Sequence, residues 1–175
     1  MTDPDFSAIS AEALNEVCFR NLYTVDGLWF LAVEEQFGFE TAFKMNQAVW
    51  EKGSFILGKR LLNSLDIEAK TPLQAFITMV LAEPLMVVHN PEVTTLTDTR
   101  AILHFIECPI QVARIRDGRG VYDGEPGCTI FLKTYAGLID PDIEVNCLAC
   151  APNPEKPDYW CEWEFTFPQD KGNEK

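Results

Sequence analysis

The sequence predicts an α+β fold, in which a helical N-terminal layer packs on a mostly antiparallel sheet with inserted helices. In residues 1–83 the apolar side chains recur at helical spacing. From residue 84 the chain changes to short apolar and β-branched runs divided by turn residues. With 47% hydrophobic residues among 175, a sizeable core can form. We therefore expect one compact domain, made of a helical region (1–83), a cysteine-rich α+β ligand-binding region (84–168) and a disordered tail (169–175).

Capping residues delimit the first helices. Ser10 can cap a helix that ends near residue 21, and Asp26 can cap the next, which Gly38 closes. A third helix is expected over residues 39–50 because its apolar contacts keep the same period.

A glycine and a proline mark the next two helices. Gly53 is expected to separate the third helix from a fourth over residues 54–65. Thr71-Pro72 is a cap followed by proline in the first turn, so another amphipathic helix is expected to begin there.

The second half should alternate strands and helices. Turns are expected at Asn90-Pro91 and at Asp98, and the last two strands should form a closing hairpin. Strands are predicted within residues 85–89, 91–99, 101–108, 143–147 and 160–167, and helices over 109–116 and 127–138.

Charge and hydropathy exclude several classes of partner. The chain has 27 acidic and 14 basic residues, a net charge of −13, which disfavours nucleic acid and anionic membranes. Neither an apolar run long enough to span a membrane nor the pattern of a signal peptide is present. We therefore expect a cytoplasmic protein, in a compartment where thiols stay reduced.

Five of the six cysteines fall in the last 70 residues, and two of them form a C-x-x-C pair. Strand alternation places Cys161 on the same buried face as Trp163 and Phe165. Cys147 should lie on the buried face of the partner strand. In a hairpin the end of one strand meets the start of the next, so Cys147 and Cys161 should be near neighbours.

The other three cysteines are expected at the same end of the sheet. Cys150 lies in a turn just past its strand, Cys108 ends an earlier strand, and Cys128 begins a helix, where the helix dipole favours a thiolate. Such a cluster suits a metal ion, with zinc first and an iron–sulfur cluster second. The expected ligands, in order of preference, are Cys147, Cys161, Cys128, Cys150 and Cys108. Buried structural thiols, a catalytic or redox-sensing cysteine and disulfides are the alternatives.

Two histidines and an arginine cluster complete the candidates. His104 lies on an apolar strand, where a core histidine fits better than a ligand. His89 is expected to be a surface or turn residue. Arg114, Arg116 and Arg119 could bind an anionic ligand such as a carboxylate, although arginines paired with nearby acids at a helix end fit better.

Several short motifs carry a family resemblance. They are Cys108-Pro109, Pro126-Gly127-Cys128, Ile139-Asp140-Pro141, Cys147-Leu-Ala-Cys150, Cys161-Glu-Trp-Glu-Phe, Asp26-Gly27-Leu28-Trp29-Phe30, Glu34-Glu35 and Phe37-Gly38-Phe39. With these motifs the chain resembles an uncharacterised family of small cytosolic proteins. The C-terminal part is more distantly similar to the aminothiazoline-carboxylate hydrolase family, through the strand that begins at Cys161, and to the 4-vinyl reductase type of small-molecule-binding domain. The resemblance implies an α+β ligand-binding fold whose cysteines chelate metal, and it assigns no catalytic residue.

Three functions follow as hypotheses. The first is a cytosolic small-molecule-binding protein with a cysteine-rich metal site. The second is a cysteine-dependent hydrolase, with Cys128 or Cys161 as nucleophile and His104 as base. The third is a non-catalytic homodimer that associates through aromatic helices around Trp29 and Trp50.

Overall fold

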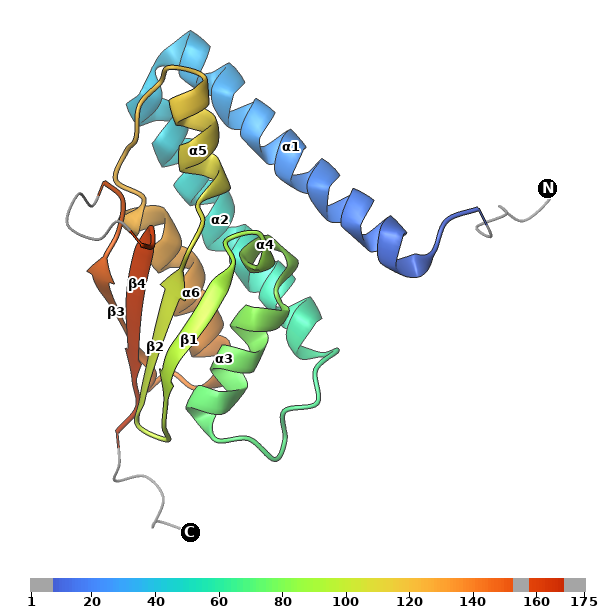
Figure 1. The fold of residues 1–175 in the computed structure, drawn as a ribbon, viewed down its shortest axis with the longest axis vertical. Coiled ribbons are helices and arrows are strands. Elements are labelled where there is room, and N and C mark those ends of the chain that lie inside the picture. Colours follow the sequence, from blue (N-terminus) through green and yellow to red (C-terminus); the bar gives the residue numbers. More distant parts are fainter. Residues whose placement is uncertain (1–7, 153–157, 169–175) are drawn as a thin grey trace. The chain divides into compact units, whose positions relative to one another are not determined.

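The computed structural model describes residues 8–152 and 158–168, and the predicted tail (169–175) lies outside them. It confirms the α+β class, with helices preceding and flanking a four-stranded antiparallel sheet (Figure 1). The elements are α1 (Ala11–Phe37), α2 (Phe39–Leu62), α3 (Pro72–Ala82), α4 (Pro84–Val87), β1 (Pro91–Leu96), β2 (Arg100–Phe105), α5 (Pro109–Arg116), α6 (Glu125–Ile139), β3 (Glu144–Ala149) and β4 (Cys161–Thr166).

By its internal contacts the chain divides into two compact units, residues 1–43 and 44–175. The boundary between the units lies inside α2, far from residue 84, where the helices were predicted to give way to strands. The prediction of one compact domain stays a prediction.

The first unit contains α1, a single helix of 27 residues. The expected ends are confirmed: the Ser10 side chain accepts a hydrogen bond from the Ala13 N–H, and Gly38 closes the helix with φ at +83°. The predicted helix start at Asp26 is wrong. No glycine or proline precedes Asp26 within the helix, and the Thr24 hydroxyl bonds back to the Arg20 carbonyl, so the helical ladder continues.

The α2 helix also runs on where an interruption was predicted. Gly53 lies inside α2, so the predicted separation into two helices is wrong. A glycine within a helix costs about 1 kcal/mol relative to alanine, which tertiary contacts can offset. One such contact is visible at Gly58, where the absence of a side chain leaves room for Tyr135 and Leu138 of α6.

Prolines begin both α3 and α4. The predicted start of α3 at Thr71-Pro72 is confirmed, and the Gln74 side chain accepts a hydrogen bond from the Thr71 N–H. The predicted strand over residues 85–89 is wrong, because α4 occupies most of it. Pro84 opens that helical turn, and the Glu83 carboxylate caps it by accepting from the Leu85 N–H.

The sheet has the strand order β1-β2-β4-β3, so β4 lies between β2 and β3 (Figure 1). All three strand pairs are antiparallel, which confirms the predicted closing hairpin of β3 and β4. One irregularity interrupts that hairpin: Cys147 pairs with Trp163, but the next pair is Ala149 with Glu162. Leu148 is therefore the extra residue of a β-bulge.

The core lies between the sheet and the helices α3 and α6, which cover one face of it (Figure 1). Aromatic side chains fill its centre. The Phe76 ring meets the Phe165 ring edge-on with centroids 4.7 Å apart, and Trp163 is fully buried. Near the start of α6, Phe131 lies 6.2 Å from Trp50 of α2, centroid to centroid. The helices therefore fix the inner face of β4, on which Cys161 lies.

Candidate functional site

The five clustered cysteines come from separate elements at one end of the sheet. Cys108 is the N-cap of α5, Cys128 lies in the first turn of α6, and Cys147 lies in β3. Cys150 follows β3 directly, and Cys161 begins β4. Within the described residues all five are free thiols.

The β-bulge determines which sulfurs meet. A regular hairpin would place Ala149 opposite Cys161, but the extra residue Leu148 shifts the register by one. Continuing the register past the pair of Ala149 with Glu162 brings Cys150 opposite Cys161. Their Sγ atoms lie 3.1 Å apart. The sequence predicted Cys147 as the near neighbour of Cys161, whereas the sulfur that touches Cys161 belongs to Cys150.

Cys150 is the hub of the cluster. Its sulfur lies 3.1 Å from the Cys161 sulfur, and hydrogen bonds with the side chains of Cys128, Cys161 and Cys147 and with the Ala151 backbone lower the pKa of its thiol. Three thiols from α6, β3 and β4 thus surround one sulfur. Because a thiolate is a much better acceptor than a thiol, this arrangement favours one negative charge on Cys150.

The pKa values of the cluster follow from that arrangement. Hydrogen bonds from Cys128 and Cys161 hold the pKa of the Cys150 thiol well below its ordinary value. The same bonds, together with burial, raise the pKa values of Cys128 and Cys161. Burial, assisted by the charge of Cys150, raises the pKa of Cys147 to about 12. These shifts favour the thiolate on Cys150 and the protonated thiol on Cys128, Cys147 and Cys161.

Cys108 lies at the margin of the cluster. Burial raises its pKa, while the N–H groups of Gln111 and Ile110 in the first turn of α5 act in the opposite direction. The charge of Cys150 also affects Cys108, but no hydrogen bond joins the two thiols among the described contacts. Cys108 is thus near the four-sulfur group without belonging to its hydrogen-bond network.

A buried glutamine that the sequence did not single out holds the loop beside the cluster. The Gln111 amide donates to the Tyr122 carbonyl at 2.8 Å and accepts from the Tyr122 N–H at 3.2 Å. This clamp fixes the approach to Gly124, where an added Cβ would lie 3.7 Å from the Cys150 sulfur. Gln111 and Tyr122 are 11 residues apart and belong to no periodic pattern, so no sequence signal reveals the clamp.

The sulfur positions differ from those of a closed zinc site. In residues 8–152 and 158–168, no group of three or more His, Cys, Asp and Glu side chains has an arrangement ready to hold a metal ion. Two thiolates on one tetrahedral zinc ion lie about 3.8 Å apart, given Zn–S bonds of about 2.3 Å. The contact of 3.1 Å between Cys150 and Cys161 is shorter than that.

Both histidines lie outside the thiol network. His104 pairs with Glu162 across β2 and β4 and therefore projects from the opposite face of the sheet from Cys161. Its ring stacks on Tyr159 at 4.1 Å and its Nε2 lies 3.4 Å from the Glu162 carboxylate. His89, expected to be a surface or turn residue, does lie in a turn, but its side chain is buried against the Phe105 ring. Burial lowers the pKa of His89 to about 4.

The three arginines diverge. Arg114 is buried, donates from Nε to the Gly120 carbonyl at 3.2 Å, and lies 5.2 Å from the centre of the Tyr122 ring. Arg116 is exposed and pairs with Asp117 at 2.9 Å. Arg119 is half-buried, and its backbone N–H donates to the Arg114 carbonyl. An anion site formed by all three stays a prediction.

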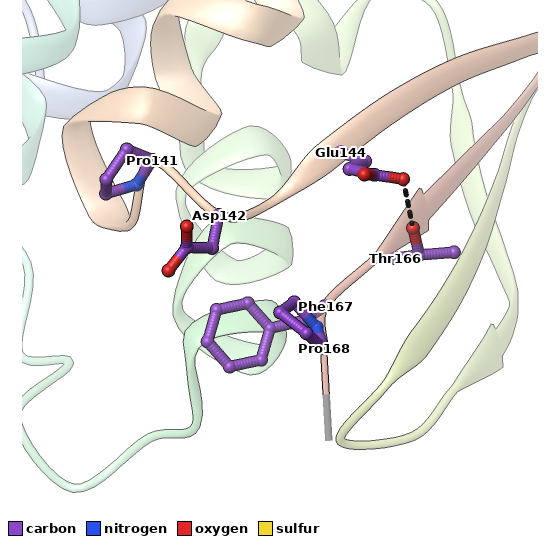
Figure 2. A pocket seen from close by; sticks show the side chains of 6 residues that line it. All are labelled: Pro141, Asp142, Glu144, Thr166, Phe167 and Pro168. Carbon is purple, nitrogen blue, oxygen red and sulfur yellow. Dashed lines mark hydrogen bonds between the residues drawn. The ribbon is translucent and has the colours of Figure 1, made fainter. Parts of the chain in front are cut away.

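A pocket of about 340 Å³ lies at the other end of β4 from the thiols. Figure 2 shows the Asp142 and Glu144 side chains there, with Thr166 donating to the Glu144 carboxylate at 3.3 Å. Phe167 and the prolines at 141 and 168 supply its apolar part. The pocket contains none of the candidate cysteines, and the binding of a small molecule beside them stays a prediction.

Within the described residues, no helix is both long and apolar enough to cross a bilayer.

Comparisons with known proteins place the chain in a family without naming an activity. No curated protein and no solved structure matches it. The predicted distant similarities to aminothiazoline-carboxylate hydrolases and to 4-vinyl reductase domains therefore stay predictions. The expected membership of an uncharacterised family is confirmed by a family model that matches residues 8–167. The chain belongs to a family of unknown function (DUF6125).

Proposed function

We propose that this protein binds a thiophilic metal ion at the four-sulfur group formed by Cys128, Cys147, Cys150 and Cys161. The observation that carries the proposal is the convergence of three thiols on the Cys150 sulfur. Four sulfurs from different elements, gathered around one point, are the donor set that zinc takes in structural sites. Zinc is the first candidate, and an iron–sulfur cluster is the second.

The electrostatics of the group support a cation. Nearby Asp123 and Glu125 help to raise the pKa of Cys147, so the surroundings are negative. The raised pKa values of Cys128, Cys147 and Cys161 mean that metal binding would release protons from these thiols. A divalent ion would then bind all four sulfurs as thiolates.

The geometry sets one condition for binding. The Cys150 and Cys161 sulfurs must separate from 3.1 Å to the spacing of about 3.8 Å that a tetrahedral zinc ion requires. Cys150 follows the β-bulge and is not held in the ladder of β3, so its side chain has the freedom to make this adjustment. Four thiolate ligands would complete the zinc coordination and make the site structural, linking α6 to the hairpin of β3 and β4.

Elemental analysis of the purified protein tests the proposal. The protein is prepared without a histidine tag and without added metal. About one equivalent of zinc or iron is expected in the wild type, and the double variant Cys147→Ser/Cys161→Ser should lose it. Cys18→Ser is the matched control, because Cys18 is an exposed thiol in α1. Wild-type protein that contains no metal, and whose free energy of unfolding does not rise when zinc is added, would overturn the proposal.

A second candidate function is a cysteine-dependent hydrolase. The low pKa of the Cys150 thiol favours it, because the thiolate is the nucleophilic form. The predicted similarity of the Cys161 strand to aminothiazoline-carboxylate hydrolases would fit the same chemistry. This candidate predicts one thiol that iodoacetamide alkylates much faster than the other five near neutral pH, and that disappears in Cys150→Ser. Slow, uniform alkylation of all six thiols would count against it.

A further inference from the structure

Cys150 and Cys161 also meet the requirements of a disulfide. Their sulfurs are 3.1 Å apart in the reduced state. The register of β3 and β4, continued past the pair of Ala149 with Glu162, brings Cys150 opposite Cys161, an arrangement in which a disulfide can bridge neighbouring strands. An S–S bond is about 2.05 Å long, so closing it requires a movement of about 1 Å.

The C-x-x-C pair meets these requirements less well. Cys147 and Cys150 lie on the same segment, on either side of the bulge at Leu148, and Cys147 pairs with Trp163. A bond between them would have to bend this segment back on itself, whereas Cys150 and Cys161 already face each other across the hairpin.

The two sulfurs of the close pair differ in access to solvent. Cys150 is partly exposed, whereas Cys161 is only 6% exposed. A small oxidant can therefore reach the Cys150 sulfur. The Cys161 sulfur is shielded from solvent but lies within reach of Cys150.

We propose that Cys150 and Cys161 form a site of oxidative modification by peroxides, with Cys150 as the sulfur that is attacked and Cys161 as the sulfur that resolves it. The inference goes beyond metal binding and requires no metal. The disulfide would also leave only two of the four thiol ligands, Cys128 and Cys147, free to bind a metal ion.

The chemistry balances in two steps. In the first, an S–O bond forms between Cys150 and a peroxide oxygen while the O–O bond breaks, giving a sulfenic acid and, with the thiol proton, one water. The sulfur loses two electrons and the peroxide gains them. In the second, the Cys161 sulfur attacks the Cys150 sulfur, the S–S bond forms and the S–O bond breaks. The hydroxyl leaves with the Cys161 proton as a second water.

The test uses the full-length, reduced, metal-free protein and an equivalent of hydrogen peroxide. After free thiols are blocked, cleavage at glutamate separates residues 145–155, which contain Cys147 and Cys150, from residues 156–162, which contain Cys161. We expect these two peptides to be joined until a reductant is added, and two of the six thiols to be lost.

Variants assign the roles. Cys147→Ser and Cys108→Ser should keep the joined peptides, and Cys150→Ser should abolish them. Cys161→Ser should leave a sulfenic acid on Cys150 that dimedone traps. A link between Cys147 and Cys150, or six thiols that remain after treatment, would overturn the inference. Because the protein carries no metal in this experiment, a failure of metal binding cannot produce either result.

Discussion

The two ends of β4 are held by different chemistry. Toward the end of the strand, Phe165 packs edge-on against Phe76 of α3 in a fully apolar setting. At its start, Cys161 is equally buried but touches the Cys150 sulfur. Burial of apolar surface stabilises a fold at any pH and without cofactors, whereas a sulfur cluster responds to protons, metals and oxidants. The strand β4 thus has an apolar end, at Phe165, and an end at Cys161 whose thiols can exchange protons.

The largest effect should come from the apolar end. Phe165→Ala removes a fully buried ring, and we expect a loss of about 3–5 kcal/mol in the free energy of unfolding, measured by urea denaturation. Leu148→Ala is the control, because Leu148 is 47% exposed and should change stability by less than about 1 kcal/mol. Equal losses in the two variants would show that the assignment of the core is wrong.

Low pH should destabilise the fold through His89, which lies near the Cys161 end of β4. His89 packs on Phe105, which pairs with Cys161, and burial lowers the pKa of His89 to about 4 from 6.5. The folded state therefore favours neutral His89. Its contribution is complete above pH 6.5 and is lost as the pH falls toward 4, by about 3 kcal/mol at most.

The measurement is stability against pH between 4 and 7, in the wild type and in His89→Phe. The variant cannot gain a proton at this position, so its stability should fall less steeply as the pH drops. Parallel curves for the two proteins would contradict the role given to His89.

Zinc should distinguish the two ends directly. At a free zinc concentration 100 times the dissociation constant, the wild type should gain about 2.7 kcal/mol in its free energy of unfolding. Cys161→Ser should gain much less because it lacks a ligand, while Phe165→Ala should keep the full gain despite its lower baseline. A zinc gain in Cys161→Ser that matches the wild type would remove Cys161 from the site.

The smallest effect concerns the close contact of α2 with α6. A Cβ on Gly58 would lie 2.9 Å from Tyr135 and 2.6 Å from Leu138, so Gly58→Ala should cost about 1–3 kcal/mol in thermal or urea unfolding. Gly137→Ala is the matched control on α6. It meets no atom within 4 Å and should stabilise the protein by about 0.5–1 kcal/mol. A neutral Gly58→Ala would mean that the helices can separate without penalty.

The sequence predicted the fold where local chemistry decides it. Ser10, Gly38 and Thr71-Pro72 mark real helix ends because their caps and prolines act within a few residues. The predicted helix break at Gly53 was wrong because tertiary packing holds α2 together through the glycine. The predicted strand from Leu85 to His89 was wrong because Glu83 and Pro84 begin a helical turn there. Local preference is a weak guide wherever distant contacts outweigh it.

The site shows the same limit. Strand alternation predicted that Cys161 faces inward, and its side chain is buried. The convergence of strand ends and helix starts predicted that the cysteines gather at one end of the sheet, and the structure places them there. The order of preference among the cysteines missed the central position of Cys150, ranked fourth. That position depends on the single extra residue of the bulge at Leu148, and no turn or glycine signal in the sequence announces it.

Titration of the reduced, metal-free protein with Co²⁺, followed by its thiolate-to-cobalt charge-transfer absorbance, tests most directly whether the sulfurs share one centre around Cys150. We expect a band that saturates near about one equivalent, that Cys150→Ser weakens severely, and that Cys18→Ser leaves intact. Cobalt that binds without this band, or a band that Cys150→Ser leaves unchanged, would contradict the account.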